Sequence, residues 1–199
     1  GASLGAGVVL ILGLANLLAD GLSMAAGAYL SSKSEREYWQ REREREAWEI
    51  EHFPEGERRE LVETYVAKGY SQEDAQLVVE IESKDHERWV DAMMVHELGL
   101  LPDERQPLAS ALATFAAFAI AGALPLVVYL LGLWLPIDPR LAFPSAVALS
   151  GVGLFILGSA KVYVTERNWL QSGLEMLAVG GVAAAVAYGV GLLLRGLGV

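Results

Sequence analysis

The chain has 199 residues, of which 53% are hydrophobic, yet its formal net charge is −10. The two properties are separated: residues 31–106, here called the acidic region, hold 21 of the 25 acidic and 11 of the 15 basic side chains. This distribution excludes a soluble globular enzyme, a disordered acidic tail and a nucleic-acid-binding protein, since no net-basic surface is available. The absence of cysteine excludes disulfide scaffolds, thiolate zinc sites, iron–sulfur clusters and cysteine nucleophiles.

Four apolar segments are long enough to cross a bilayer, which takes about 20 helical residues. They run over about residues 4–30, 108–135, 141–164 and 169–194. No basic stretch precedes the first segment, so it does not resemble a cleavable signal peptide. We therefore expect an all-α membrane protein with four visible transmembrane helices, divided into residues 1–30, 31–106 and 107–199.

Lysine and arginine near the ends of the spans predict the orientation. The turn between the third and fourth spans has Lys161 and Arg167, whereas the turn between the second and third has only Arg140. Five more bases follow the first span: Lys33, Arg36, Arg41, Arg43 and Arg45. The acidic region is thus predicted to be cytoplasmic, with both chain ends on the far side. Such an N-terminus without a signal is unusual, so we expect a further helix upstream of Gly1.

The acidic region predicts three helices. Residues 31–52 contain no glycine or proline, so the first span should continue through them as one long helix. Pro54 should end that helix and open a second, because the residue before proline is pushed out of the helical conformation. Gly69 ends the second helix. Ser71, followed three residues later by an acid, resembles a capping box that opens a third helix reaching about Leu98.

A polar stripe on the first span could carry chemistry. Asn16, Asp20 and Met24 are four residues apart and so lie on one face of a helix. A carboxylate at this depth costs about 2.5–3.5 kcal/mol on insertion scales, so it persists where it faces a water path, a partner or an ion. Asn16 and Asp20 offer hard oxygen ligands and Met24 offers a soft thioether, a combination that suits a borderline cation such as Fe²⁺. Asp20 could release a proton when it binds the ion. In the alternative interpretation, Asp20 makes a helix–helix hydrogen bond and Met24 is core.

The acidic region contains a second candidate site. Carboxylates three residues apart on a helix share a face and can bind one metal ion together. Two such pairs occur on the first and second helices, and two methionines and an acid lie near the end of the third: Glu46 and Glu49, Glu57 and Glu60, and Met93, Met94 and Glu97. In the alternative interpretation these acids only solvate a helix face. However, ten excess negative charges oppose compact packing unless cations neutralise them.

Enzymatic motifs are missing from the sequence. Glu49 and His52 form a single Glu-x-x-His, whereas a ferritin-like di-iron bundle needs this motif on two helices. There is no Walker A and no H-E-x-x-H sequence. We therefore expect neither enzymatic activity nor an organic cofactor.

Residues 13–27 (GLANLLADGLSMAAG) resemble the second membrane helix of the vacuolar iron transporter family, in a bacterial form. Residues 29–35 (YLSSKSE), which follow, resemble the sequence typical of bacterial members. The resemblance covers the whole chain. It implies a homodimer that moves ferrous iron, and often manganese, out of the cytoplasm in exchange for protons. It also implies that cytoplasmic helices collect the ion, and that Met24 lies on the membrane path. The implied metal-binding residues are Glu46, Glu49, Glu57, Glu60, Met93, Met94 and Glu97.

The chain departs from the family pattern in two places. The family has five spans, and the first, which carries an acid of the translocation site, has no counterpart here. Ala28 stands where some relatives have glutamate.

We expect an integral protein of the bacterial inner membrane that exports or sequesters Fe²⁺ by proton antiport. Its partners would be divalent ions, protons, the lipid bilayer and a second copy of the chain, without nucleic acid. Mn²⁺, Co²⁺ and Zn²⁺ stay open as ions, because carboxylate and thioether ligands bind several of them. The alternatives are an electrically driven uniporter, a membrane-anchored iron store or ferroxidase, and a metal sensor.

Overall fold

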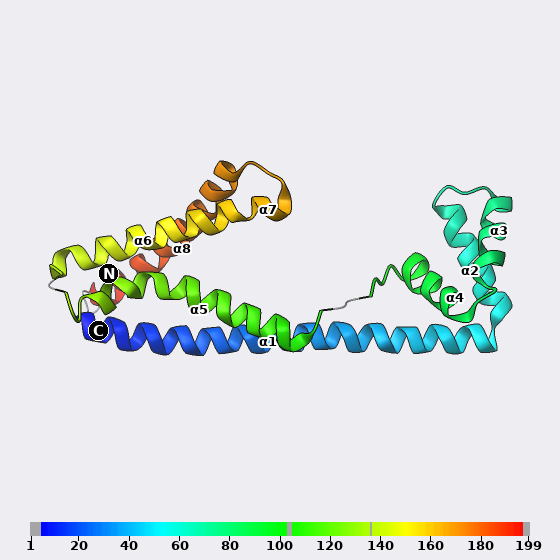
Figure 1. Ribbon diagram of the computed structural model, residues 1–199, viewed down its shortest axis with the longest axis horizontal. Coiled ribbons are helices and arrows are strands. Elements are labelled where there is room, and N and C mark those ends of the chain that lie inside the picture. Colours follow the sequence, from blue (N-terminus) through cyan, green and yellow to red (C-terminus); the bar gives the residue numbers. More distant parts are fainter. Residues whose placement is uncertain (1–4, 103–104, 136, 197–199) are drawn as a thin grey trace. The chain divides into compact units, whose positions relative to one another are not determined.

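The computed structural model describes residues 5–102, 105–135 and 137–196, and these residues are predominantly helical with no strand among them (Figure 1). The elements are α1 (Ala6–His52), α2 (Pro54–Ala67), α3 (Gln72–Glu82), α4 (His86–Ala92), the π-helix η1 (Met93–Glu97), α5 (Pro107–Leu131), α6 (Pro139–Ala160), α7 (Val162–Thr165) and α8 (Trp169–Gly196). Among the described residues, four helices are long and apolar enough to span a membrane: α1, α5, α6 continued by α7, and α8. The predicted all-α fold with four candidate spans is confirmed.

The chain forms two compact units, of which one comprises residues 1–25 and 112–199 and the other residues 26–111. We call them the spanning unit and the acidic unit. The functional division predicted at residues 30/31 and 106/107 stays a prediction.

Small residues let the helices of the spanning unit approach closely. Leu17 of α1 lies against Gly122 of α5, where a Cβ would be 2.4 Å from the leucine side chain. A Cβ at Gly153 of α6 would likewise meet a leucine of α5. At Gly158 of α6 it would lie 2.6 Å from the carbonyl oxygen of Ser172 in α8. Close backbone approach at small residues is typical of packing between membrane helices.

The acidic unit has a hydrophobic core to which α1, α2, α3, α4 and η1 contribute. Ile50 of α1, Leu61 of α2, Val79 of α3 and Trp89 of α4 are each at most 4% exposed. The predicted cap of α3 is confirmed, because the Ser71 hydroxyl accepts the backbone N–H of Asp74 at 3.1 Å. The predicted boundary between α1 and α2 at Phe53-Pro54 is also confirmed.

The structure corrects the third helix that we expected from Ser71 to about Leu98. This helix is broken after Glu82, and α4 begins at His86. The Asp85 carboxylate accepts the backbone N–H of Arg88 at 2.9 Å, so this short polar side chain starts a new helix instead of continuing the old one. After α4 the helix continues as the wider π-helix η1, in which the Leu98 N–H donates to the Met93 carbonyl oxygen at 3.2 Å.

Candidate metal site

Five carboxylates from three elements meet at one place in the acidic unit. Oxygens of Glu46, Glu49 and Glu57 lie within 4.8 Å of one another, and so do oxygens of Glu57, Glu60 and Glu97. We call these five residues the carboxylate cluster. Glu57 belongs to both groups of three. The structure thus brings together all five glutamates that the sequence singled out, although their role as ligands stays a prediction.

Local geometry explains why the two helical pairs converge. The single residue Phe53 connects the end of α1 to Pro54 at the start of α2, so these two helix ends must lie close together. The pair on the last turns of α1 therefore comes to lie beside the pair on the first turns of α2. Glu97 is the last residue of η1. A π turn accommodates about one more residue than an α turn, so α-helical spacing from Met93 does not give the direction of Glu97.

Two members of the carboxylate cluster are buried without full hydrogen bonding. Glu46 is 1% exposed and Glu57 is 5% exposed. One oxygen of each, Oε2, is shielded from solvent and has no hydrogen-bond partner among the described residues. A buried carboxylate oxygen without a partner is costly, so the two oxygens offer ligand positions to a cation.

The protonation of the carboxylate cluster reflects this burial. Desolvation, followed by the negative charges of Glu60, Glu46, Glu49 and Glu97, raises the pKa of Glu57 to about 7. Desolvation and then neighbouring acids raise the pKa of Glu97 to about 7. Burial also raises the pKa of Glu46, against the opposing hydrogen bond from Arg45. Near neutral pH, a divalent cation would therefore displace protons from these groups.

Sequence reasoning missed two residues beside the carboxylate cluster, Glu42 and Arg45. The Arg45 guanidinium lies 2.8 Å from Oε2 of Glu42, 3.0 Å from Oε1 of Glu46 and 3.8 Å from Oε2 of Glu49. Glu42 is 5% exposed, although it lies on a helix crowded with charged residues. The sequence did indicate that these two residues could pair, because oppositely charged side chains three residues apart share a helix face. Arg45 offsets part of the repulsion among the neighbouring carboxylates, and it leaves Oε2 of Glu46 without a hydrogen-bond partner among the described residues.

Met93 and Met94 are 0% and 1% exposed and belong to the hydrophobic core of the acidic unit. Their position is one that hydrophobic packing alone would produce, so their role as thioether ligands stays a prediction.

An ionic clamp joins α1 to the helix that leads into η1. Arg43 pairs with Asp91 and, at 2.6 Å, with Glu87, both on α4. Since η1 follows α4 directly, this clamp restrains the segment that carries Glu97 relative to Glu46 and Glu49 on α1.

The polar stripe of the spanning unit lies on one face of α1, as predicted. Asn16 Nδ2 donates to Asp20 Oδ2 at 2.9 Å, which is a bond within the helix. Asn16, Asp20 and Met24 are all exposed in the single chain, and Met24 is 49% exposed. The stripe is therefore open to water, to an ion or to another helix.

The four apolar spans of an all-α chain define an integral membrane protein. Comparison with known proteins gives the particular family. The model of the VIT family matches residues 1–192. The vacuolar iron transporter of Toxoplasma gondii is 42% identical over 201 residues, which cover 98% of this chain and 67% of that protein.

Two plant proteins are also similar. Vacuolar iron transporter 1 of Eucalyptus grandis is 35% identical over 95% of this chain and 75% of its own length. The protein of the same name from Arabidopsis thaliana is 35% identical over 94% of this chain and 74% of its own length. The chain belongs to the VIT family. The resemblance stated from the sequence is confirmed, as is the prediction of a transporter and not an enzyme.

Proposed function

We propose that the chain moves Fe²⁺ out of the cytoplasm in exchange for protons. In this proposal the carboxylate cluster collects the ion, and Asn16, Asp20 and Met24 pass it through the membrane. The observation that carries the proposal is the convergence of five carboxylates around two buried oxygens that lack partners. The names of the relatives support iron as the cargo.

The donor chemistry supports the choice of ion and of counter-ion. Carboxylate oxygens bind Fe²⁺ and Mn²⁺, and Co²⁺ and Zn²⁺ compete for the same donors. The raised pKa values of Glu57 and Glu97, both about 7, mean that ion capture releases protons at cytoplasmic pH. Asp20 would exchange a proton for the ion within the span, whereas a uniporter would not require Asp20 to titrate.

Compartment, orientation and assembly are further parts of the proposal. The concentration of Lys and Arg after the first span and between the third and fourth supports a cytoplasmic acidic unit. The likeness of residues 29–35 to bacterial members favours a bacterial inner membrane, although the relatives compared above are eukaryotic. Gly181 of α8 has no atom near the position of a Cβ, so this face is open to the second copy of a homodimer.

Flux measurements test the membrane path. Proteoliposomes are held anaerobic with a pH dye inside, and Fe²⁺ entry is followed under an imposed proton gradient. Asp20→Asn should abolish flux and leave ion binding by the acidic unit unchanged. Glu175→Gln is the matched control, because Glu175 is an acid of another span and should leave flux near the original level. Normal transport by the Asp20 variant would overturn the role of Asp20.

Binding measurements on the full chain test the carboxylate cluster. Glu57→Gln removes the acid shared by both groups of three and should weaken Mn²⁺ binding by roughly 100-fold, the upper end of the effects seen around metal ligands. Glu63→Gln is the control, since Glu63 is an exposed acid of the same helix outside the cluster. Equal binding by both variants would contradict the assignment.

The alternative of an iron store or ferroxidase is disfavoured by the position of His52. Its Nδ1 bonds to the Trp48 carbonyl at 2.7 Å, and its ring stacks on Trp48 at a centroid distance of 4.2 Å. The one histidine of the Glu-x-x-His motif is therefore engaged with its own helix. Aerobic conversion of Fe²⁺ to Fe³⁺ by the purified chain would revive this alternative, and binding without flux would favour a sensor.

A further inference from the structure

Arg45 contacts three carboxylates of α1 with three different nitrogens. Its Nη1 lies 2.8 Å from Glu42 Oε2, its Nη2 lies 3.0 Å from Glu46 Oε1, and its Nε lies 3.8 Å from Glu49 Oε2. Glu46 and Glu49 are members of the carboxylate cluster, whereas Glu42 belongs to neither group of three. The planar guanidinium is therefore shared between two candidate ion ligands and one acid outside the cluster.

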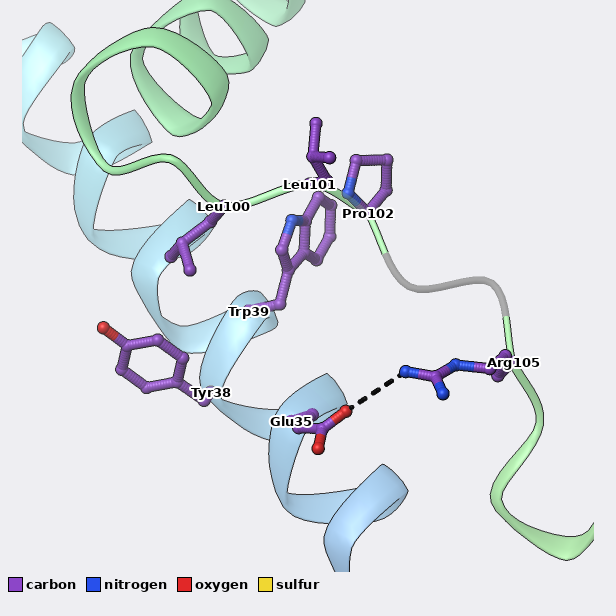
Figure 2. Close-up of a pocket in the computed structure, with 7 residues that line it drawn as sticks. All are labelled: Glu35, Tyr38, Trp39, Leu100, Leu101, Pro102 and Arg105. Atoms are coloured by element: carbon purple, nitrogen blue, oxygen red, sulfur yellow. Dashed lines mark hydrogen bonds and ion pairs between the residues drawn. The ribbon is translucent and has the colours of Figure 1, made fainter. Parts of the chain in front are cut away.

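Burial distinguishes these contacts from an ordinary ion pair at the surface. In the pair that Figure 2 shows, Arg105 Nη2 lies 3.5 Å from Glu35 Oε2, and both side chains are more than half exposed. Glu42 and Glu46, in contrast, are both buried. Charges interact more strongly where water is excluded, so the positive charge of Arg45 has a larger effect on its partners than a surface arginine would have.

A cation bound by the carboxylate cluster would meet the charge of Arg45. The guanidinium donates a hydrogen bond to Oε1 of Glu46 and offsets part of the negative charge that would attract the ion. Its charge also acts on the second group of three: desolvation and neighbouring acids raise the pKa of Glu97, whereas Arg45 lowers it. Because like charges repel, Arg45 and the ion would compete for the same carboxylates.

Arg45 can give way to an ion without losing every partner. Its side chain is 49% exposed, so packing leaves it room to move. Glu42 accepts from Arg41 at 2.9 Å through Oε1 and contacts Arg45 through its other oxygen. Of the three acids that Arg45 contacts, Glu42 alone would stay available while an ion held the other two.

We propose that Arg45 is a tethered competitor of the transported ion, which holds Glu46 and Glu49 before the ion arrives and stays on Glu42 when the ion binds. This inference rests on the proposed role of the carboxylate cluster in ion capture and adds a control of its affinity. Since the competitor is attached to the same helix, its effective concentration at the cluster is high. Its return would therefore speed the release of the ion toward the membrane.

Calorimetric titration of the full chain in detergent with Mn²⁺ measures this competition. Arg45→Gln should tighten Mn²⁺ binding by about tenfold, the equivalent of one charge-assisted hydrogen bond, and should slow the release of Mn²⁺ to a chelator. Arg45→Lys keeps the charge without the planar group that reaches three carboxylates, so its affinity should lie between those of the wild type and Arg45→Gln. Damage to the fold would not tighten binding. Unchanged or weaker binding by Arg45→Gln would overturn the proposal.

Arg41→Gln is the matched control. Arg41 carries the same charge about one turn earlier on α1, is 72% exposed and pairs with Glu42 at 2.9 Å. Its loss should change the affinity for Mn²⁺ much less than the loss of Arg45. Equal effects of the two substitutions would show that only net charge matters, and would overturn the proposal.

Glu42 provides a second test with the opposite sign. Glu42→Gln should weaken Mn²⁺ binding in the wild type, because Arg45 then keeps only the acids that the ion requires. In the Arg45→Gln background the same substitution should lose most of its effect, since no competitor is left to hold. Equal effects in the two backgrounds would mean that Glu42 acts independently of Arg45, which contradicts the proposal.

Glu57→Gln separates this proposal from the capture role on which it rests. Normal Mn²⁺ binding by Glu57→Gln would overturn the capture role and the competition with it. Weaker binding by Glu57→Gln, together with equal effects of the Arg41 and Arg45 substitutions, would leave the capture role in place and overturn the competition alone.

Discussion

Leu61, Trp89 and Met93 in the acidic unit are at most 4% exposed, whereas Leu12, Ile120 and Val182 in the spanning unit are between 56% and 72% exposed. Both units are helical, so the contrast does not come from secondary structure. The acidic unit buries apolar surface away from water, while the spanning unit displays it and packs through glycine and serine. The two units therefore depend on different solvents, and a substitution should act differently in each.

The largest expected effect is the loss of a core side chain from the acidic unit. Met93→Ala should reduce the free energy of unfolding by about 2–5 kcal/mol, because Met93 is fully buried and the substitution leaves a cavity. Leu12→Ala in the spanning unit removes a side chain that is 56% exposed and should have a much smaller effect. Denaturant unfolding of the full chain in detergent, followed by tryptophan fluorescence, measures both. Similar losses of unfolding free energy in the two variants would contradict the difference in burial between the two units.

The acidic unit should also respond to pH without metal. The carboxyl pKa values of Glu57 and Glu97 rise from 4.5 to about 7 on folding, so between these pH values the folded state keeps protons that the unfolded chain has released. Stability should therefore be independent of these groups below pH 4.5 and fall as pH rises from about 4.5 to 7, by at most about 3 kcal/mol for Glu57.

Thermal unfolding measured across this pH range checks the expectation. Glu57→Gln should reduce the dependence of stability on pH. Saturating Mn²⁺ should reverse the slope, because the ion binds the deprotonated carboxylates of the folded state. A stability that rises with pH in metal-free protein would contradict the burial of Glu57 and the raised pKa values of Glu57 and Glu97.

The spanning unit should be sensitive where a glycine of one helix lies against the backbone of another, as Gly158 does. Gly158→Val should cost about 1–3 kcal/mol, since a Cβ there would lie 2.6 Å from the Ser172 carbonyl oxygen and from the Met176 Cβ. Gly181→Val is the control, because a Cβ at Gly181 meets nothing within 4 Å in the single chain. Size-exclusion chromatography after heating measures how much of each variant stays folded. Equal thermal stability of the two variants would argue against the packing of α6 on α8.

The smallest effect should come from the clamp between α1 and α4. Arg43→Gln should reduce stability by about 1 kcal/mol, because the partners Glu87 and Asp91 are 77% and 62% exposed and water screens their charges. Arg59→Gln, an exposed residue of α2, should change little. Raising the salt concentration should reduce the difference in unfolding free energy between the two variants. A difference that persists at 1 M salt would show that Arg43 acts through packing and not through charge.

Local rules predicted much of the helical framework. The apolar runs, the proline at residue 54 and the Ser71 cap each act over a few residues, and the observed helices follow them. The spacing of the glutamate pairs on α1 and α2 also follows from local geometry. The break before α4 was missed because Asp85 lies inside a long stretch that otherwise favours a helix.

Tertiary packing decided the remaining features. Glu42 is 5% exposed, and the charged side chains that contact it are Arg41 and Arg45 of its own helix; its burial does not follow from that local spacing alone. The position of Glu97 depends on a π-helix, which has no dependable sequence signal and is favoured here by the surrounding core. The approach of Glu97 to Glu57 and Glu60 therefore could not be derived from spacing alone.

The sharing of Glu57 has a consequence for the proposed traffic of ions. An ion held by Glu46, Glu49 and Glu57 is already attached to a member of the group formed by Glu57, Glu60 and Glu97. Its transfer between the two groups requires the exchange of two neighbouring ligands and no release into bulk water. Two ions would instead compete for the same carboxylate, so an arriving ion weakens the hold on the one before it. The acidic unit would then work as a relay, in which each arrival promotes the next departure.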